Sequence, residues 1–196
     1  MKKILGYLLL LSIFASCGGS GSKNSSEAKS SAKAAKGVIK AAALISKSEA
    51  ADILGQSMED RETTKRYFID ESSYVSKDLS FSISLWQEAL HDKSSEFEKT
   101  LLKDGWSNYM KEMEKAFARA PNTSVIEGID GIAHLQDGGA MGMWLLHIFY
   151  DDYFITITVM NTSISRVDSA ELTSWKHVKL NEAGKLAVSK LKEILR

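Results

Sequence analysis

One histidine and one aspartate are spaced so that they can act together in acid–base chemistry. Asp130 lies four residues before His134, beside a glycine-rich stretch, and in a strand both side chains can face the same side. A carboxylate that orients an imidazole makes that imidazole a candidate general base. The competing interpretation is structural, with His134 satisfied by hydrogen bonds at a strand edge. A hydrolase or metal-dependent enzyme around His134 and Asp130 is therefore one hypothesis for this chain.

A second group of side chains has the chemistry of metal ligands. His147 precedes Asp151 and Asp152, and imidazole with carboxylates can bind a divalent transition metal. An Asp-Asp pair between two apolar segments is also what a polar turn requires. The chain contains no H-E-x-x-H, no G-x-S-x-G, no phosphate-binding glycine loop and no cysteine pair. We therefore expect no enzyme, no catalytic residue, no metal and no cofactor.

The lone cysteine indicates membrane attachment. Cys17 follows Lys2-Lys3, an apolar run from Ile4 to Phe14 and the small residues Ala15-Ser16. This order is typical of a secretory signal, and the apolar run is too short to span a bilayer. The last four of these residues, Phe-Ala-Ser-Cys, resemble the lipobox of bacterial lipoprotein precursors, with phenylalanine where leucine is usual. The resemblance implies that residues 1–16 are a cleaved signal peptide and that Cys17 carries the lipid.

Residues 18–36 have the composition of a spacer. They include six Ser and four Lys, and no aromatic or branched aliphatic residue. Such a segment cannot bury enough apolar surface to fold, and a flexible chain of this length reaches about 25 Å. Residues 17–36 are therefore predicted to be a lipidated cysteine and its tether, and residues 37–196 a single domain.

The charge balance excludes one class of partner. The chain has 25 Lys and Arg against 25 Asp and Glu, and removal of Lys2 and Lys3 with the signal leaves a net charge of −2. A protein that binds nucleic acid needs a clustered basic surface, so we expect no nucleic-acid partner. With no cysteine after Cys17, the domain has no disulfide and depends on its apolar core.

Helices are predicted where capping residues meet apolar side chains at helical spacing. They are expected over residues 46–55, 95–119 and about 182–195. Ser46 and Glu49 form a capping-box pair, and Gly55 supplies a stop. Gly105 falls in the middle of the long helix, where it marks either a break or a close packing contact.

Strands are predicted from alternation and from apolar runs between turn residues. They are expected at Lys65–Ile69, Leu79–Leu85, Val125–Ile126, Ile132–Leu135, Met143–Tyr150 and Tyr153–Met160. In the second of these, apolar residues alternate with three serines, which predicts one solvent-facing side. The last two are apolar on both faces and form a hairpin at the centre of the sheet. The fold class is therefore α+β, an antiparallel sheet of about five to seven strands flanked by helices on both faces.

Glycines and soft apolar side chains gather between two of the predicted strands. Met141, Met143 and Trp144 follow Gly138-Gly139, and together they can form the mouth of a pocket for a small apolar ligand or lipid. Core packing is the competing interpretation.

Three stretches carry a resemblance to a known group. The stretches are SKSEAADILG at 46–55, VIEGIDGIA at 125–133 and the hairpin after them. They resemble small bacterial lipoproteins of undefined function with a PsbP-like α/β/α sandwich, although Ile129 replaces a glycine of the group's turn. The resemblance implies a sandwich fold and binding of something outside the cytoplasm.

The sequence therefore predicts a membrane-anchored, non-enzymatic lipoprotein of the cell envelope that binds a protein partner or assists an envelope assembly. A small-ligand or lipid-binding module is the second hypothesis, and the enzyme around His134 is the third. Gly18 and Gly19 follow the cysteine in place of the aspartate that retains some lipoproteins at the inner membrane. We therefore expect the outer membrane and an extracytoplasmic domain.

Overall fold

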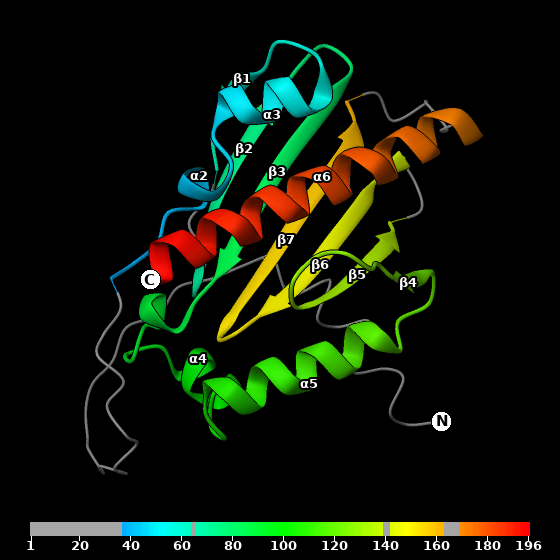
Figure 1. The fold of residues 1–196 in the computed structure, drawn as a ribbon. Coiled ribbons are helices and arrows are strands. Elements are labelled where there is room, and N and C mark those ends of the chain that lie inside the picture. Colours follow the sequence, from blue (N-terminus) through cyan, green and yellow to red (C-terminus); the bar gives the residue numbers. More distant parts are fainter. Residues whose placement is uncertain (1–36, 64–65, 139–141, 163–168) are drawn as a thin grey trace. The chain divides into compact units, whose positions relative to one another are not determined.

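The computed structural model describes residues 37–63, 66–138, 142–162 and 169–196 (Figure 1). The helices are α2 (Ala41–Leu44), α3 (Lys47–Leu54), the short 3₁₀ helix η1 (Glu88–Leu90), α4 (Glu96–Leu101), α5 (Trp106–Ala118) and α6 (Ala170–Leu195). The strands are β1 (Glu59–Arg61), β2 (Ile69–Val75), β3 (Leu79–Trp86), β4 (Thr123–Val125), β5 (Ile132–Asp137), β6 (Trp144–Tyr150) and β7 (Tyr153–Asn161). No helix in these ranges is long and apolar enough to cross a membrane. The predicted signal peptide, Cys17 and the spacer lie outside the described residues.

The seven strands form one antiparallel sheet in the order β1-β2-β3-β7-β6-β5-β4. The predicted α+β fold with an antiparallel sheet is thereby confirmed, at the upper end of the expected strand number. The predicted hairpin is also confirmed, because β6 pairs with β7 from Trp144↔Val159 to Tyr150↔Tyr153. Its turn contains Asp151, whose φ of 52° is a conformation that aspartate tolerates.

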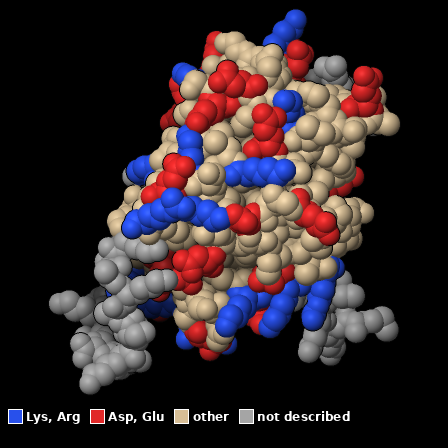
Figure 2. All heavy atoms as spheres, in the orientation of Figure 1, with Lys and Arg blue, Asp and Glu red and all other residues tan. Residues whose placement is uncertain are grey.

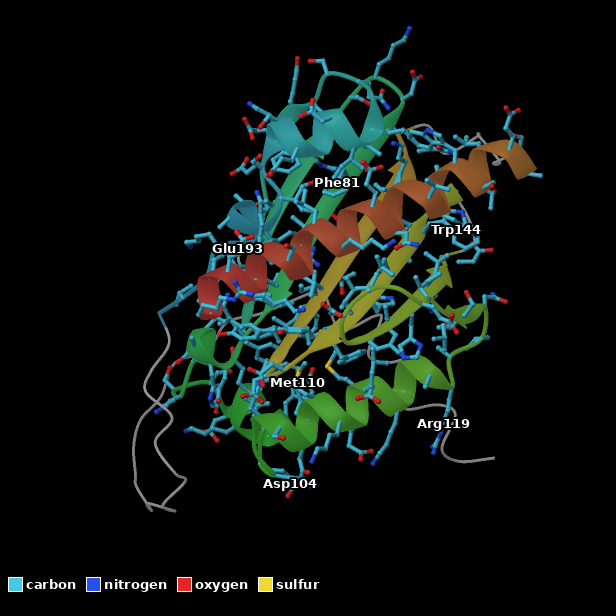
Figure 3. The ribbon with its side chains drawn as sticks, viewed as in Figure 1. Phe81, Asp104, Met110, Arg119, Trp144 and Glu193 are labelled. Carbon is cyan, nitrogen blue, oxygen red and sulfur yellow. The ribbon has the colours of Figure 1, made fainter. Side chains whose placement is uncertain are left out.

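Branched and aromatic side chains fill the face of the sheet on which α2, α3 and α6 pack. They include Phe81, Ile83, Leu146, Ile148, Ile155 and Ile157, all nearly or completely buried. Figure 3 labels Phe81 on the side of the sheet that carries α3 and α6. A Cβ on Gly184 of α6 would lie 2.7 Å from Leu146 Cδ2, so the glycine allows this helix to approach the sheet closely.

A second apolar cluster involves α4, α5 and the other side of the sheet. Phe154 packs in this cluster with Trp106 and Met110 of α5, whereas the next residue, Ile155, belongs to the first cluster. Because successive side chains of a strand point to opposite faces, the two clusters lie on opposite sides of β7. Figure 3 shows Met110 between α5 and the sheet.

Two predicted helices have different boundaries in the structure. The helix expected over 95–119 is wrong as a single element, because Gly105 separates α4 from α5 with φ 86° and ψ 160°. This conformation is essentially reserved for glycine, which accounts for the break. The final helix begins at Ala170 rather than near residue 182, with Ser169 accepting a hydrogen bond from the Leu172 amide. The capping box of Ser46 and Glu49 at α3 is confirmed.

The first strands also differ from their predictions. The strand expected at Lys65–Ile69 instead runs from Ile69 to Val75, and Lys65 itself lies outside the described residues. Its acidic and serine residues have low strand propensity, and pairing with β3 along its whole length compensates for this. The short edge strand β1 has no sequence signal, and the predicted strand at Val125–Ile126 is observed as β4.

Candidate functional site

Five hydroxyl side chains line up on the face of the sheet opposite α6. They are Ser73 of β2, Ser82 and Ser84 of β3, and Thr156 and Thr158 of β7, and all are half-buried. We call this surface the hydroxyl face. Ser73 pairs with Ser82 and Ser82 with Thr158, so three neighbouring strands present hydroxyls in one row. A second row joins Glu71 of β2 to Ser84 and Ser84 to Thr156, and Arg61 of β1 pairs with Ser73 at the edge of the first row.

The second cluster packs toward one end of this face. It draws on Trp86, Phe149 and Phe154 near the β6–β7 turn, and Thr156 is linked to α5 through His147, which stacks on Phe117. Hydroxyls donate and accept hydrogen bonds and carry no charge, and neighbouring strands space them about 4.8 Å apart. The hydroxyl face can therefore hydrogen-bond to a polar surface laid across the strands.

His147 lies at the border between the hydroxyl face and α5. Its Nδ1 lies 3.3 Å from Thr156 Oγ1, its Nε2 lies 3.0 Å from Gln136 Oε1, and its ring stacks on Phe117 at 4.1 Å. Burial lowers the pKa of His147 to about 3, and His134 lowers it in the same direction. A neutral ring held by two polar partners acts as a structural link between α5 and the sheet rather than as a base near pH 7.

The structure separates the two residues of the alternative acid–base hypothesis. His134 is buried, pairs across strands with His147 and packs against Phe149 on the α5 side of the sheet. Burial lowers the pKa of His134, and the nearby Glu114 of α5 opposes this shift. Asp130 is exposed and forms an ion pair with Lys192 of α6, on the other side. Asp130 therefore does not orient His134, and the proposed dyad is wrong in its geometry.

The candidate metal ligands weighed in the sequence analysis are not assembled into a site either. Both ring nitrogens of His147 are close to Thr156 and Gln136, while Asp151 and Asp152 lie at the β6–β7 turn. Within the described ranges, no three side chains of His, Cys, Asp or Glu are placed to hold a metal ion. The aspartates correspond to the polar-turn interpretation.

The glycine-rich segment before β6 is used mainly for packing. Trp144 meets His177 of α6 edge to face at 4.1 Å and packs against the first cluster. A Cβ on Gly138 would clash with Met143, which lies half-buried beside it. Met141 lies outside the described residues. Figure 3 labels Trp144 next to α6, in agreement with this packing.

Two open hollows lie elsewhere on the domain. One, of about 570 Å³, is lined by Tyr150, Asp151, Lys192, Leu195 and Arg196. The other, of about 500 Å³, is lined by Gln56, Asp78, Leu79, Asn161, Ser169, Glu171, Leu172 and Trp175. Neither includes Met143, Trp144 or a residue of the hydroxyl face. Figure 2 shows acidic and basic side chains intermixed over the visible α6 side, without a broad area of one sign.

Among the described residues, the buried charged residues Lys176 and Glu98 were not predicted from the sequence. Lys176 of α6 is fully buried, and its Nζ donates to Gly142 O at 2.7 Å and to Asn161 Oδ1 at 2.9 Å. Lys176 lies four residues before Leu180, on the apolar side of α6. The predicted helix begins near residue 182 and therefore does not include Lys176. Glu98 is also buried and accepts a hydrogen bond from the Asp92 amide at 2.8 Å. Both residues tie loops to helices.

Comparison with known proteins gives no match of this chain to a family model, to a curated protein or to a solved structure. The hydroxyl face and the surrounding geometry are therefore the basis for assigning a function.

Proposed function

We propose that this protein is a non-enzymatic lipoprotein of the bacterial cell envelope whose domain binds a partner protein. The N-terminal residues support the anchor, since a charged start, an apolar run and Cys17 match the pattern of a lipoprotein signal. One acyl chain is a marginal anchor, so the two or three chains of a lipoprotein would hold the domain durably. The outer membrane and an extracytoplasmic domain are part of the same proposal.

The hydroxyl face is the observation that carries the binding role. A surface that only had to remain soluble would ordinarily carry lysines and glutamates of mixed sign. Arg61 and Glu71 lie on the β1–β2 side of this face, whereas the centre presents the short, neutral side chains of Ser82, Ser84 and Thr156 on a rigid sheet. Such side chains lose little conformational entropy when a partner orders them. Such a surface suits a polar protein face better than a small apolar ligand.

The distribution of the histidines supports binding over catalysis. His134 and His147 are buried beneath α5, where burial lowers the pKa of both, and Asp130 pairs with Lys192 elsewhere. The PsbP-like resemblance of the sequence is compatible with a binding domain of this kind.

Site-specific photo-crosslinking in intact cells tests the proposal. A photoreactive amino acid placed at Ser82 of the full chain should crosslink to one defined protein. The matched control is Ser189, an exposed position on α6, which should give no such product. A Ser82→Arg variant should abolish the complex on gentle extraction, whereas Ser189→Arg should preserve it.

Two results would contradict the proposal. Equal crosslinking at both positions would mean that the hydroxyl face is not the contact surface. A Cys17→Ala variant that stays in the membrane fraction would contradict lipid anchoring.

A further inference from the structure

The described chain begins at one particular end of the sheet. The Ile39 amide donates to Gln87 Oε1 at 2.9 Å, and Gln87 Nε2 donates back to Ile39 O at 2.7 Å. Gln87 directly follows β3, and its amide donates to Phe68 O. Figure 1 shows this blue start of the described chain away from the β2–β3 turn. The preceding chain is therefore attached at the Phe68 end of the domain.

The same end carries exposed aromatic side chains. Tyr67 and Phe97 are 49% and 40% exposed, and their ring centroids lie 4.9 Å apart. We call these two residues the tether-end patch. Beneath it, the buried Phe68 ring lies 6.4 Å from Tyr67 and connects the patch to the second cluster.

The backbone holds Tyr67 in an unusual conformation. Its φ is 26°, in a region that bulky residues rarely occupy, and the surrounding turn is closed by the Ile69 amide donating to Arg66 O at 2.9 Å. Sparsely populated conformations cost free energy and persist only where the surrounding structure imposes them. The strained residue, Tyr67, has a half-exposed aromatic ring, whereas the ring of the next residue, Phe68, is buried.

Charges around the patch are balanced. The exposed acidic residues of the adjoining segments are Glu88, Asp92, Glu96 and Asp104, and the exposed basic residues are Lys40, Arg66, Lys93, Lys99 and Lys103. Lys40 pairs with the half-buried Asp70. Lys99 and Glu96 are paired at 2.6 Å. The surface around the aromatic pair therefore has no strong attraction to, or repulsion from, anionic lipid.

We propose that the tether-end patch inserts into the headgroup region of the membrane that holds Cys17, so that the domain has a fixed orientation. This inference rests on the lipid anchor proposed above. Tyrosine and phenylalanine partition favourably at the membrane interface, and amphipathic surfaces insert about 5–10 Å. A spacer of nineteen residues reaches about 25 Å and keeps the effective concentration of the patch at the lipid surface high. The β2–β3 turn lies a strand length, about 26 Å, from the patch.

Depth-dependent quenching tests the orientation on the full lipidated chain. Since lipidation occupies the only native cysteine, a single introduced cysteine can be labelled with an environment-sensitive fluorophore. Phe97→Cys reports on the patch, and Lys77→Cys, at the exposed β2–β3 turn, is the matched control. Both proteins are reconstituted into phosphatidylcholine vesicles with and without a headgroup-level lipid quencher.

The expected result is a blue shift and about half or more of the emission lost at position 97, with little change at position 77. Adding Tyr67→Ser should reduce the quenching at position 97, and adding anionic lipid should leave it unchanged. Circular dichroism of each variant checks that the fold is retained.

The opposite outcomes separate the two proposals. Protein that floats with the vesicles while neither label is quenched, or while both are quenched equally, overturns the orientation and leaves the anchor standing. Protein that does not float with the vesicles contradicts the anchor itself, and with it the orientation.

Discussion

The two faces of the sheet differ in what their side chains accomplish. On one face, residues such as Ile83, Leu146 and Ile157 are completely or almost completely buried against helices. On the other, aromatic packing under α5 covers the end near Phe154, and the hydroxyls of Ser82 and Thr158 remain half-exposed beyond it. One sequence of alternating residues along β3 and β7 produces both faces.

This difference separates stabilising residues from those of the proposed binding surface within the same strands. A face that buries branched side chains contributes roughly 25 cal/mol for each square ångström of apolar surface removed from water. Serine hydroxyls that stay half in water contribute little of this kind. The first face therefore contributes more to the stability of the fold than the hydroxyl face does.

Neighbouring substitutions on β7 provide the most direct test of this contrast. Ile157→Ala should lower the free energy of unfolding by about 2–5 kcal/mol, because it leaves a cavity in a closely packed region. Thr158→Ala, one residue further on and on the opposite face, should cost less than about 1 kcal/mol. Urea unfolding of the two variants measures both values. Equal losses would mean that the hydroxyl face is a second structural core.

The buried histidines make the second face sensitive to pH. The unfolded chain protonates His147 as the pH falls through 6.5, whereas the folded protein keeps it neutral down to about pH 3 because of burial. The unfolded state then binds more protons, so stability decreases as the pH falls across this window. The slope for one such group is at most about 1.4 kcal/mol per pH unit, or about 2 kcal/mol from pH 6.5 to 5.

A His147→Gln variant isolates this contribution. Urea unfolding at pH 7, 6 and 5 should show a shallower decline of stability for the variant than for the natural protein. No measurement is made below pH 5, because the pKa of Glu49 is lowered to about 2 and its stabilising contribution is lost as the pH falls below about 4.5. Identical slopes in the two proteins would rule out a buried neutral His147.

Residue patterns predicted the parts of this fold that local physics determines. The alternation from Leu79 to Leu85, the hairpin of β6 and β7, and the capping box at Ser46 all specify their elements within a few residues. β2 and the first half of α6 were misplaced or missed. The polar residues of β2 are stabilised by pairing with β3. The polar residue Lys176 in the first half of α6 is stabilised by its hydrogen bond to Asn161 of β7.

The candidate site was harder to predict, because it depends on register. Asp130 and His134 are four residues apart, yet a turn around Gly131 sends one to Lys192 and the other beneath α5. The serines of β3 share one side of the strand as the alternation predicts, although Ser80 is buried rather than solvent-facing. Their alignment with Thr156 and Thr158 required the pairing of β3 with β7, which the sequence does not encode locally.

The N-terminal caps of α3 and α4, on opposite sides of the sheet, provide a test with a smaller expected effect on stability. At α3, Ser46 and Glu49 exchange both capping-box hydrogen bonds, whereas at α4 Ser95 accepts a single bond of 3.3 Å from Glu98. Ser46→Ala should therefore cost about 1 kcal/mol, and Ser95→Ala a smaller part of that range. Thermal or urea unfolding compares them. A larger loss at Ser95 would show that α4 is the more critical helix.

The smallest effect on stability should come from the hydroxyl face itself. Ser82→Val replaces a half-buried serine by a residue with higher strand propensity, so the free energy of unfolding should stay unchanged or rise by up to about 1 kcal/mol. The same substitution removes a donor and an acceptor from the centre of the row that Ser73 and Thr158 complete. It should weaken capture of the crosslinked partner while the domain folds normally. A variant that is both more stable and fully competent in binding would leave the serines without a role, since a sheet under no other constraint would carry valine there.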